Sequence, residues 1–265
     1  MNKLSIELSE NNVGCYINTN LKNINEEQTL EIKKLLNKHG VLFFKDQNLS
    51  PEEYISFASH FGKPAEYPML KPHKDFKDIY VIERKKTDTG MSFGEGPHTD
   101  SSYLSKPPSY TMLQAINVPK EGQGNTLFYN QFLAYEALPE NIKYKIENLK
   151  GIFSSKGKIA QTRVLREAEH GTSDTKEIKS EHRLVQPING RKTIYCSPGH
   201  IVGFANENSD QKELIDFLIS HQTKKDFSFS FSWRKGDIAI WANKSILHAA
   251  TAFNGDRKMF RITIQ

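Results

Sequence analysis

Two histidines and one aspartate are the residues of this chain best suited to bind a metal. His98 and Asp100 are two residues apart, and His248 lies near the other end of the chain. Two imidazoles and one carboxylate form the facial triad that binds one side of a ferrous ion and leaves the opposite positions open. The set therefore suggests an iron oxygenase. The spacing of His98 and Asp100 alone leaves two alternatives open, a three-ligand zinc site with a bound water and a metal-free hydrogen-bonded pair.

Two arginines follow His248 closely. Arg257 and Arg261 are four residues apart, and on a strand an even separation places side chains on one face. Guanidinium groups pair bidentately with carboxylates. If one end of a dicarboxylate chelates the metal, these arginines are suited to bind the carboxylate at its other end. Thr126, which begins an apolar segment after a glycine-rich turn, adds a hydroxyl. The alternative is that each arginine is an ordinary surface charge.

Strands and helices must bring these distant residues together. His98 and Asp100 are expected at a strand edge, where residues two apart point to the same side, with His248 arriving from across a barrel. Apolar and alternating segments predict strands at 41–44, 79–85, 110–118, 126–130, 192–197, 227–233, 237–241 and 259–264. Helical periodicity and capping signals predict helices at 26–39, 50–61, 130–139, 139–149 and 209–222.

This order of elements predicts one domain spanning 1–265. Many strands with helices mainly toward the N-terminus indicate a mainly β (α+β) fold, a double-stranded β-helix (jelly roll, cupin-like) with flanking helices. Segments 66–97 and 155–185 are expected to be mobile lids that line a substrate pocket. For 155–185, where charged and polar residues replace the apolar pattern, a solvated loop without function is the alternative.

Composition narrows the class of protein. The 36 basic and 31 acidic residues give a net charge of +5, and the basic residues are scattered, which argues against a nucleic-acid partner. The two cysteines, Cys15 and Cys196, make no disulfide framework. The first twelve residues lack an apolar run, and no segment approaches the roughly 20 apolar residues of a membrane span. These features predict a cytoplasmic protein with a small-molecule substrate and no membrane partner.

Five segments, in order, resemble the taurine dioxygenase/chlorophenoxyacetate dioxygenase family of Fe(II)- and 2-oxoglutarate-dependent oxygenases. The resemblance covers the chain from about Gly40 onward and rests on residues 39–64, 97–119, 124–139, 183–204 and 233–264. It implies a double-stranded β-helix and an enzyme that hydroxylates its substrate with Fe(II), 2-oxoglutarate and dioxygen, giving succinate and CO₂. Dimers and tetramers are frequent in the family, so the resemblance allows a homo-oligomer, although the sequence itself does not determine the oligomeric state.

The resemblance assigns roles to the residues singled out above. It makes His98, Asp100 and His248 the iron ligands, and it makes Thr126 and Arg257 the residues that bind the far carboxylate of 2-oxoglutarate. Arg261 matches a second arginine that lies near the cosubstrate and meets the anionic head of the substrate in sulfonate-using members. Related halogenases replace the aspartate with a small residue, so Asp100 implies hydroxylation.

Three positions depart from the family pattern. Tyr67 stands where sulfonate-using members have a histidine, Pro97 precedes the His98 motif where tryptophan is common, and the segment Gly94–Gly96 lacks an asparagine of the taurine enzyme. Taurine is therefore not the expected substrate, and a small carboxylate, sulfonate or sulfate ester is. Tyr67, Arg261 and Phe204 are the predicted substrate contacts, with packing as the alternative for the two aromatic residues. A metal-dependent hydrolase and a non-enzymatic small-molecule-binding jelly roll are the alternative functions.

Overall fold

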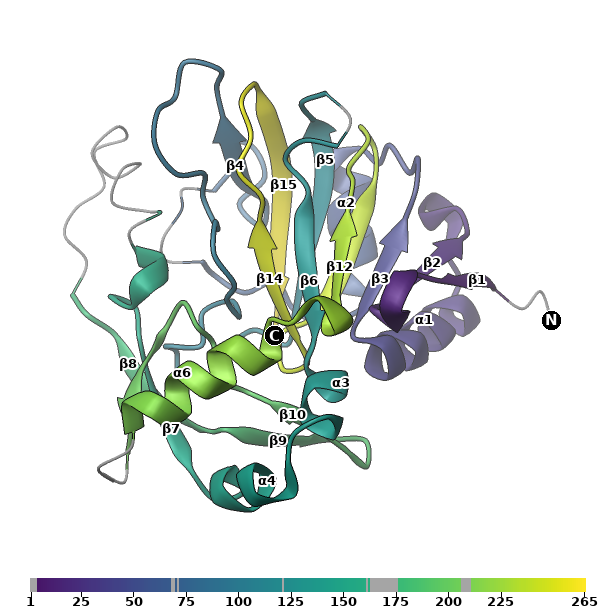
Figure 1. Ribbon diagram of the computed structural model, residues 1–265. Coiled ribbons are helices and arrows are strands. Elements are labelled where there is room, and N and C mark those ends of the chain that lie inside the picture. The colour runs from purple at the N-terminus through teal and green to yellow at the C-terminus, as the bar shows by residue number, and fades with distance from the viewer. Residues whose placement is uncertain are drawn as a thin grey trace.

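A seven-stranded sheet and a three-stranded sheet face each other across the centre of the molecule (Figure 1). The structure is a computed structural model that describes residues 4–67, 70, 72–120, 122–160, 162, 176–205 and 211–265. The large sheet has the order β1 (Ser5–Leu8), β2 (Cys15–Asn18), β3 (Val41–Phe44), β13 (Ile238–Ala242), β5 (Tyr110–Asn117), β15 (Arg257–Ile264) and β4 (Tyr80–Arg84). The small sheet has the order β12 (Ser228–Phe231), β6 (Thr126–Asn130) and β14 (Ile246–Ala250).

The two sheets are held together by a buried aromatic cluster. Phe43 of β3 stacks on Phe231 of β12 with 4.4 Å between ring centroids, and Phe128 of β6 packs edge-on against Trp241 of β13. Complete burial of such a side chain stabilises a fold by roughly 1.5–3 kcal/mol. This cluster therefore fixes β6 and β14 opposite β5, β13 and β15.

The outer face of the large sheet is covered by two helices, α1 (Glu26–His39) and α2 (Pro51–Ser59). Capping boxes start both helices, with Asn25 and Ser50 as the N-cap residues. In β3, Val41 and Phe43 point toward the small sheet while Leu42 and Phe44 point toward the helices. Burial on both faces explains why this strand is an uninterrupted apolar run.

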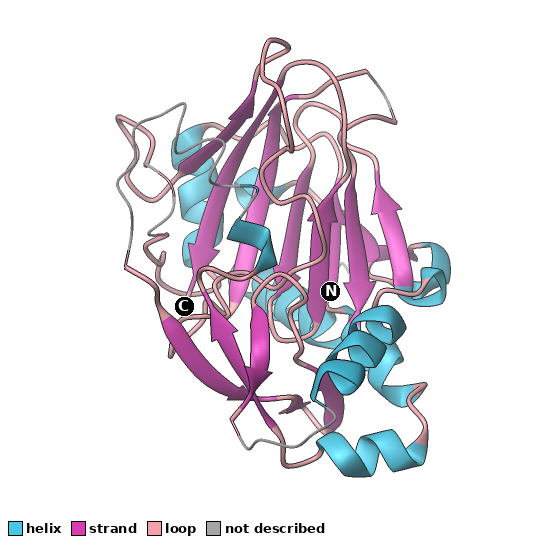
Figure 2. Ribbon diagram, turned by 60° about the vertical axis from the view of Figure 1, so that its left-hand side comes forward, coloured by secondary structure: helices cyan, strands magenta, loops and turns pink. Residues whose placement is uncertain are grey.

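A third layer lies below the two sheets in Figure 1. It contains the helices α3 (Gln131–Glu136), α4 (Glu140–Ile146) and α6 (Gln211–Gln222), and the strands β7 (Lys150–Ser154), β8 (Lys179–Arg183), β9 (Val185–Ile188), β10 (Arg191–Ile194) and β11 (Ile201–Phe204). These strands pair as β11-β7-β8 and β10-β9, and their apolar residues form a separate cluster with α6. Figure 2 shows strands through the middle of the molecule and most of the helical turns toward its periphery.

The structure confirms the predicted helices and strands to within a few residues at their ends, and it confirms a mainly β fold. It adds strands that were not predicted, among them β14, which carries His248. The two predicted lid segments contain regular structure, because β4 lies within 66–97 and β8 within 155–185. Residues 68, 69, 71, 161 and 163–175 of these segments lie outside the described residues. That either segment closes over a site remains a prediction.

Candidate functional site

His98, Asp100 and His248 converge, as their residue types suggested. One ligand atom from each lies within 4.8 Å of the other two, and this is the one such group of histidine, cysteine and acidic residues in the part of the chain that the structure describes. The Nε2 atoms of His98 and His248 lie 3.7 and 3.5 Å from the Asp100 Oδ1 atom. All three side chains are buried. The arrangement has the size and the donor set of a three-ligand metal site.

The backbone brings the two histidines together differently from the expectation. His98 and His248 form an isolated antiparallel bridge, in which each backbone N–H donates to the carbonyl of the other at 2.9 Å. Asp100 lies beyond the bridge in a turn, and the next residue, Ser101, has a φ of 47°. The expectation that His98 and Asp100 share a strand edge is therefore wrong, since the turn and not a strand aims the carboxylate at the histidines.

Charge and burial set the protonation of the cluster. Burial alone would raise the pKa of the Asp100 carboxyl, but Arg261, His248 and His98 hold that pKa well below its usual value. The Arg261 Nη2 atom lies 2.8 Å from Asp100 Oδ1. Burial lowers the pKa of His248 to about 3, and Asp100 offsets only part of this effect. At neutral pH the cluster thus offers an ionised carboxylate and a neutral His248 imidazole, which are the forms that bind metals.

A chain of buried hydrogen bonds fixes the other oxygen of Asp100. The Thr111 hydroxyl donates to Asp100 Oδ2 at 2.7 Å, and the Asn243 side-chain amide donates to Thr111 Oγ1 at 3.0 Å. The Trp241 indole N–H donates to Asn243 Oδ1 at 3.1 Å. An indole nitrogen can only donate, so it sets the orientation of the Asn243 amide and, through it, the direction of the Thr111 hydroxyl. Because these hydrogen bonds occupy Asp100 Oδ2, Asp100 Oδ1 is the oxygen that faces the histidines.

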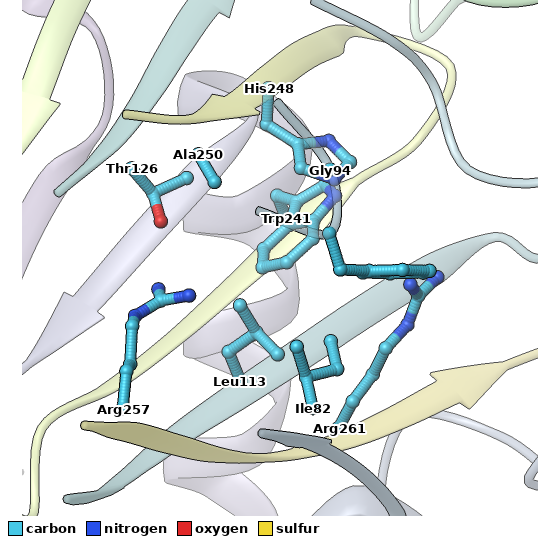
Figure 3. Close-up of a pocket in the computed structure, with 10 residues that line it drawn as sticks. Ile82, Gly94, Leu113, Thr126, Trp241, His248, Ala250, Arg257 and Arg261 are labelled. Carbon is cyan, nitrogen blue, oxygen red and sulfur yellow. The ribbon is translucent and has the colours of Figure 1, made fainter. Parts of the chain in front are cut away.

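A cavity adjoins the cluster between the two sheets (Figure 3). Arg257 and Arg261 rise into it from β15, as their spacing predicted, and Thr126 faces them from the start of β6. The Trp233 indole N–H donates to Thr126 Oγ1 at 3.0 Å, which leaves the hydroxyl hydrogen of Thr126 to be donated elsewhere. Apolar side chains complete the walls, namely Ile82, Phe93, Leu113 and Trp241. Two cations and a hydroxyl in an apolar cavity are suited to bind a carboxylate.

A second opening also borders the cluster. Tyr67, Phe93, Ile159, Thr162 and His200 line it together with His98 and Asp100. The Arg261 guanidinium carbon lies 4.2 Å from the centroid of the Tyr67 ring, a cation–π distance. The predicted Tyr67 thus lies at the site beside Arg261. The structure does not bring Phe204 there, because that ring is buried in the separate apolar cluster that includes residues of α6.

His200 was missed by the sequence analysis. It is buried, its Nδ1 lies 2.9 Å from the Ser102 Oγ atom, and its ring centroid is 6.3 Å from that of His98. The nearby Thr99 backbone N–H donates to Ser197 Oγ at 2.9 Å, which joins the two segments. In the sequence, His200 is marked only by the preceding Gly199 and the apolar segment that follows. That local pattern does not reveal a contact with Ser102, which lies about a hundred residues away.

The residues present fit the groups that such a centre requires. Two imidazole nitrogens and one carboxylate oxygen on one side of a point match a divalent iron site with open positions opposite. The cavity beside it carries Thr126 and Arg257 at its far end, where the second carboxylate of a chelating dicarboxylate would lie. The fit rests on the donor types, their separation and the buried guanidinium groups.

The comparisons with known proteins agree with this geometry. The family described as "Taurine catabolism dioxygenase TauD, TfdA family" matches residues 14–263. The chain belongs to this family. It is 30% identical over 248 residues to an alkylsulfatase of Acinetobacter baylyi, covering 88% of this chain and 75% of the relative. It is 26% identical to the alpha-ketoglutarate-dependent 2,4-dichlorophenoxyacetate dioxygenase of Cupriavidus pinatubonensis, covering 84% of this chain and 83% of the relative.

The fold matches solved structures of the same kind. A taurine dioxygenase from Burkholderia xenovorans superposes with a TM-score of 0.81 at 23% identity, over 98% of this chain and 90% of that one. Family membership confirms the predicted resemblance, the class of 2-oxoglutarate-dependent dioxygenase and the cofactors Fe(II), 2-oxoglutarate and dioxygen. None of the helices among the described residues has the length and apolar character needed to cross a membrane.

Proposed function

We propose that this chain hydroxylates a small anionic organic molecule, a carboxylate, a sulfonate or a sulfate ester, at a centre built from His98, Asp100 and His248. The observation that carries the proposal is the convergence of these three buried side chains beside a cavity that contains Arg257, Arg261 and Thr126. Fe(II), with 2-oxoglutarate and dioxygen, supplies the oxidising power to hydroxylate a C–H bond, giving succinate and CO₂.

The protein supplies binding and orientation. His98, Asp100 and His248 hold the metal through their Nε2 and Oδ1 atoms, and the Thr111 hydroxyl keeps Asp100 Oδ2 occupied so that one oxygen is presented to the metal. Arg257 and Thr126 bind the far carboxylate of 2-oxoglutarate, which directs its oxo-acid end toward the centre. The apolar walls formed by Ile82, Leu113 and Trp241 exclude water from the cosubstrate.

Arg261 is the proposed contact for the anionic group of the substrate. In the structure its guanidinium pairs with Asp100 Oδ1, the oxygen proposed to bind the metal. Once that oxygen binds a metal, the charge of Arg261 is available to an anion in the opening lined by Tyr67 and His200. Relatives named for a sulfate ester and for a phenoxyacetate support an anionic substrate. Phe204 lies in a separate apolar cluster and supports no substrate contact.

We also propose that the two facing sheets form the predicted double-stranded β-helix. The cytoplasmic location, the homo-oligomer and the closing of segments 66–97 and 155–185 over the site remain predictions.

Anaerobic reconstitution tests the proposed centre. Adding Fe(II) and then 2-oxoglutarate to the protein should produce a visible metal-to-ligand absorption band, and His98→Ala should abolish it. Screening carboxylates, sulfonates and alkyl sulfates for substrate-triggered succinate release would then identify the substrate class. A wild-type protein that gives no band and no turnover with any of these compounds would refute the proposal.

A further inference from the structure

A smaller cavity shares part of its lining with the cavity of Figure 3. Ile82, Phe93 and Arg257 line both cavities, so the two cavities lie next to each other against the same side chains. The smaller cavity adds Arg84 and Ser92 to the polar lining. None of the roles proposed above uses either residue.

Arg84 brings a second buried guanidinium to this region. It is the cross-strand partner of Arg257 in the pairing of β4 with β15, and both guanidinium carbons lie 5.7 Å from the Phe253 ring centroid. Its Nη2 atom donates to the carbonyls of Asp88 and Gly90 at 3.2 and 3.1 Å. Within the described ranges, no carboxylate lies within 4.0 Å of a nitrogen of Arg84. Two buried cations on one cavity favour an anion between them.

Ser92 adds an unused hydrogen-bond donor. Its side chain is 3% exposed, and its hydroxyl has no hydrogen-bond partner among the described residues. The backbone N–H of Ser92 donates to Glu95 Oε1, which fixes the position of the loop. The Ser92 hydroxyl is not used in this contact. A buried hydroxyl without a partner costs free energy that a bound acceptor would recover.

We propose that Arg84 and Ser92, together with Arg257, form a second carboxylate subsite that allows the chain to bind 2-oxo dicarboxylates longer than 2-oxoglutarate. The inference rests on the proposed function, because the metal centre must hold the oxo-acid end of such a molecule. The far carboxylate of 2-oxoglutarate reaches Thr126 and Arg257. An added methylene, as in 2-oxoadipate, carries that carboxylate past Arg257 toward the N–H groups of Arg84 and the hydroxyl of Ser92.

Binding measurements on the metal-loaded protein without oxygen test the subsite. Both 2-oxoglutarate and 2-oxoadipate should bind to the wild type with Fe(II), as followed by the visible absorption band. Arg84→Met should weaken 2-oxoadipate binding by about tenfold or more, the loss of a hydrogen bond to a charged group, and should change 2-oxoglutarate binding less than twofold. The control Lys85→Met removes an exposed positive charge next to Arg84 and should affect neither molecule.

If Arg84→Met fails to fold, Ser92→Ala still tests the subsite, because the Ser92 hydroxyl has no hydrogen-bond partner among the described residues. It should weaken 2-oxoadipate binding several-fold and leave 2-oxoglutarate binding unchanged. Wild-type protein that binds 2-oxoglutarate but not 2-oxoadipate would overturn the subsite alone. Equal weakening of both molecules by Ser92→Ala would also overturn it. Failure to bind 2-oxoglutarate would instead refute the proposed function.

Discussion

The two oxygens of Asp100 have different partners, and this difference organises the candidate centre. Oδ2 accepts a hydrogen bond from Thr111, whereas Oδ1 lies near both histidines and pairs with Arg261. Trp241 and Asn243 fix the direction of the Thr111 hydroxyl. Asp100 Oδ2 therefore stays hydrogen-bonded to Thr111, and Asp100 Oδ1 is left to bind a cation. Hydrogen-bonding partners of metal ligands commonly control metal affinity in this way.

Thr111→Val should weaken metal binding. The valine keeps the shape of threonine but removes the donor to Asp100 Oδ2, so the carboxylate can rotate and the Asn243 amide loses its acceptor. We expect a loss of about ten- to hundredfold in affinity for Mn(II) or Fe(II), measured by competition with a chelating dye. Thr111→Ser retains the hydroxyl and should stay within a few-fold of the wild type. Equal losses in both variants would show that packing and not the hydroxyl matters.

Arg261→Met should destabilise the metal-free protein more than the metal-bound protein. Without a metal, removing the guanidinium leaves the Asp100 carboxylate buried without its cation, which costs about 3–5 kcal/mol. A bound metal supplies that charge, so the loss in the free energy of unfolding should shrink when Mn(II) is added. Urea unfolding with a chelator and with Mn(II) measures both values. An equal loss in the two conditions would contradict the proposed exchange of Arg261 for the metal.

At the scale of elements, the turn before β11 is packed directly against a proposed ligand. A Cβ atom added to Gly199 would lie 2.9 Å from the Cβ atoms of both His98 and Ile159. The Ile159 backbone N–H also donates to the Gly199 carbonyl at 3.0 Å, which holds the turn in place. The absence of a side chain at this position therefore allows the turn that carries His200 to approach the centre.

Gly199→Ala should displace His98 and weaken metal binding. Inserting a methyl group into such a contact costs about 1–3 kcal/mol, which we expect to appear in both metal affinity and the free energy of unfolding. Gly203→Ala is the matched control in the same segment, because a Cβ there would meet only Gln211 Oε1, at an ordinary 3.5 Å. Metal affinity that is unchanged in Gly199→Ala would indicate that the turn moves away without disturbing His98.

Helix α6 is joined to α3 by a buried histidine that makes this contact sensitive to acid. His221 Nε2 lies 2.8 Å from the Ala134 carbonyl oxygen, and burial lowers its pKa despite that hydrogen bond. A pKa below the unfolded value means that the contribution to stability is complete above about pH 6.5 and is lost as the pH falls. His221→Gln keeps a donor for Ala134 and should lose less stability than the wild type between pH 7 and pH 5. Identical pH profiles in urea unfolding would contradict this assignment.

The strands and helices that sequence patterns predicted are those with a clear apolar signal. Strand β3 and helix α1 are apolar where they meet the core, and both were predicted at their observed bounds. Strand β8 was not predicted, because it is a mostly exposed strand of charged and polar residues with no apolar alternation. The role of Thr111 and the position of His200 depend on contacts between distant segments, which no local pattern encodes.

At the scale of the whole molecule, two facing sheets enclose the candidate centre. The fold matches a taurine dioxygenase with a TM-score of 0.81 at 23% identity. Both histidines lie on the side of the small sheet, His248 in β14 and His98 in the segment bridged to it, whereas the two arginines come from β15 of the large sheet. The pairing of the sheets therefore determines the distance between the centre and the carboxylate clamp.

Consumption of 2-oxoglutarate tests the central claim most directly. With Fe(II), dioxygen and a substrate from the anionic panel, the wild type should convert 2-oxoglutarate to succinate and CO₂ in equal amounts, coupled to hydroxylated product. Asp100→Ala should lose this activity by at least about a hundredfold while remaining folded by circular dichroism, because a ligand of the centre is removed. An Asp100→Ala protein that retains wild-type turnover, or a wild type that consumes no 2-oxoglutarate with any of these substrates, would contradict the account.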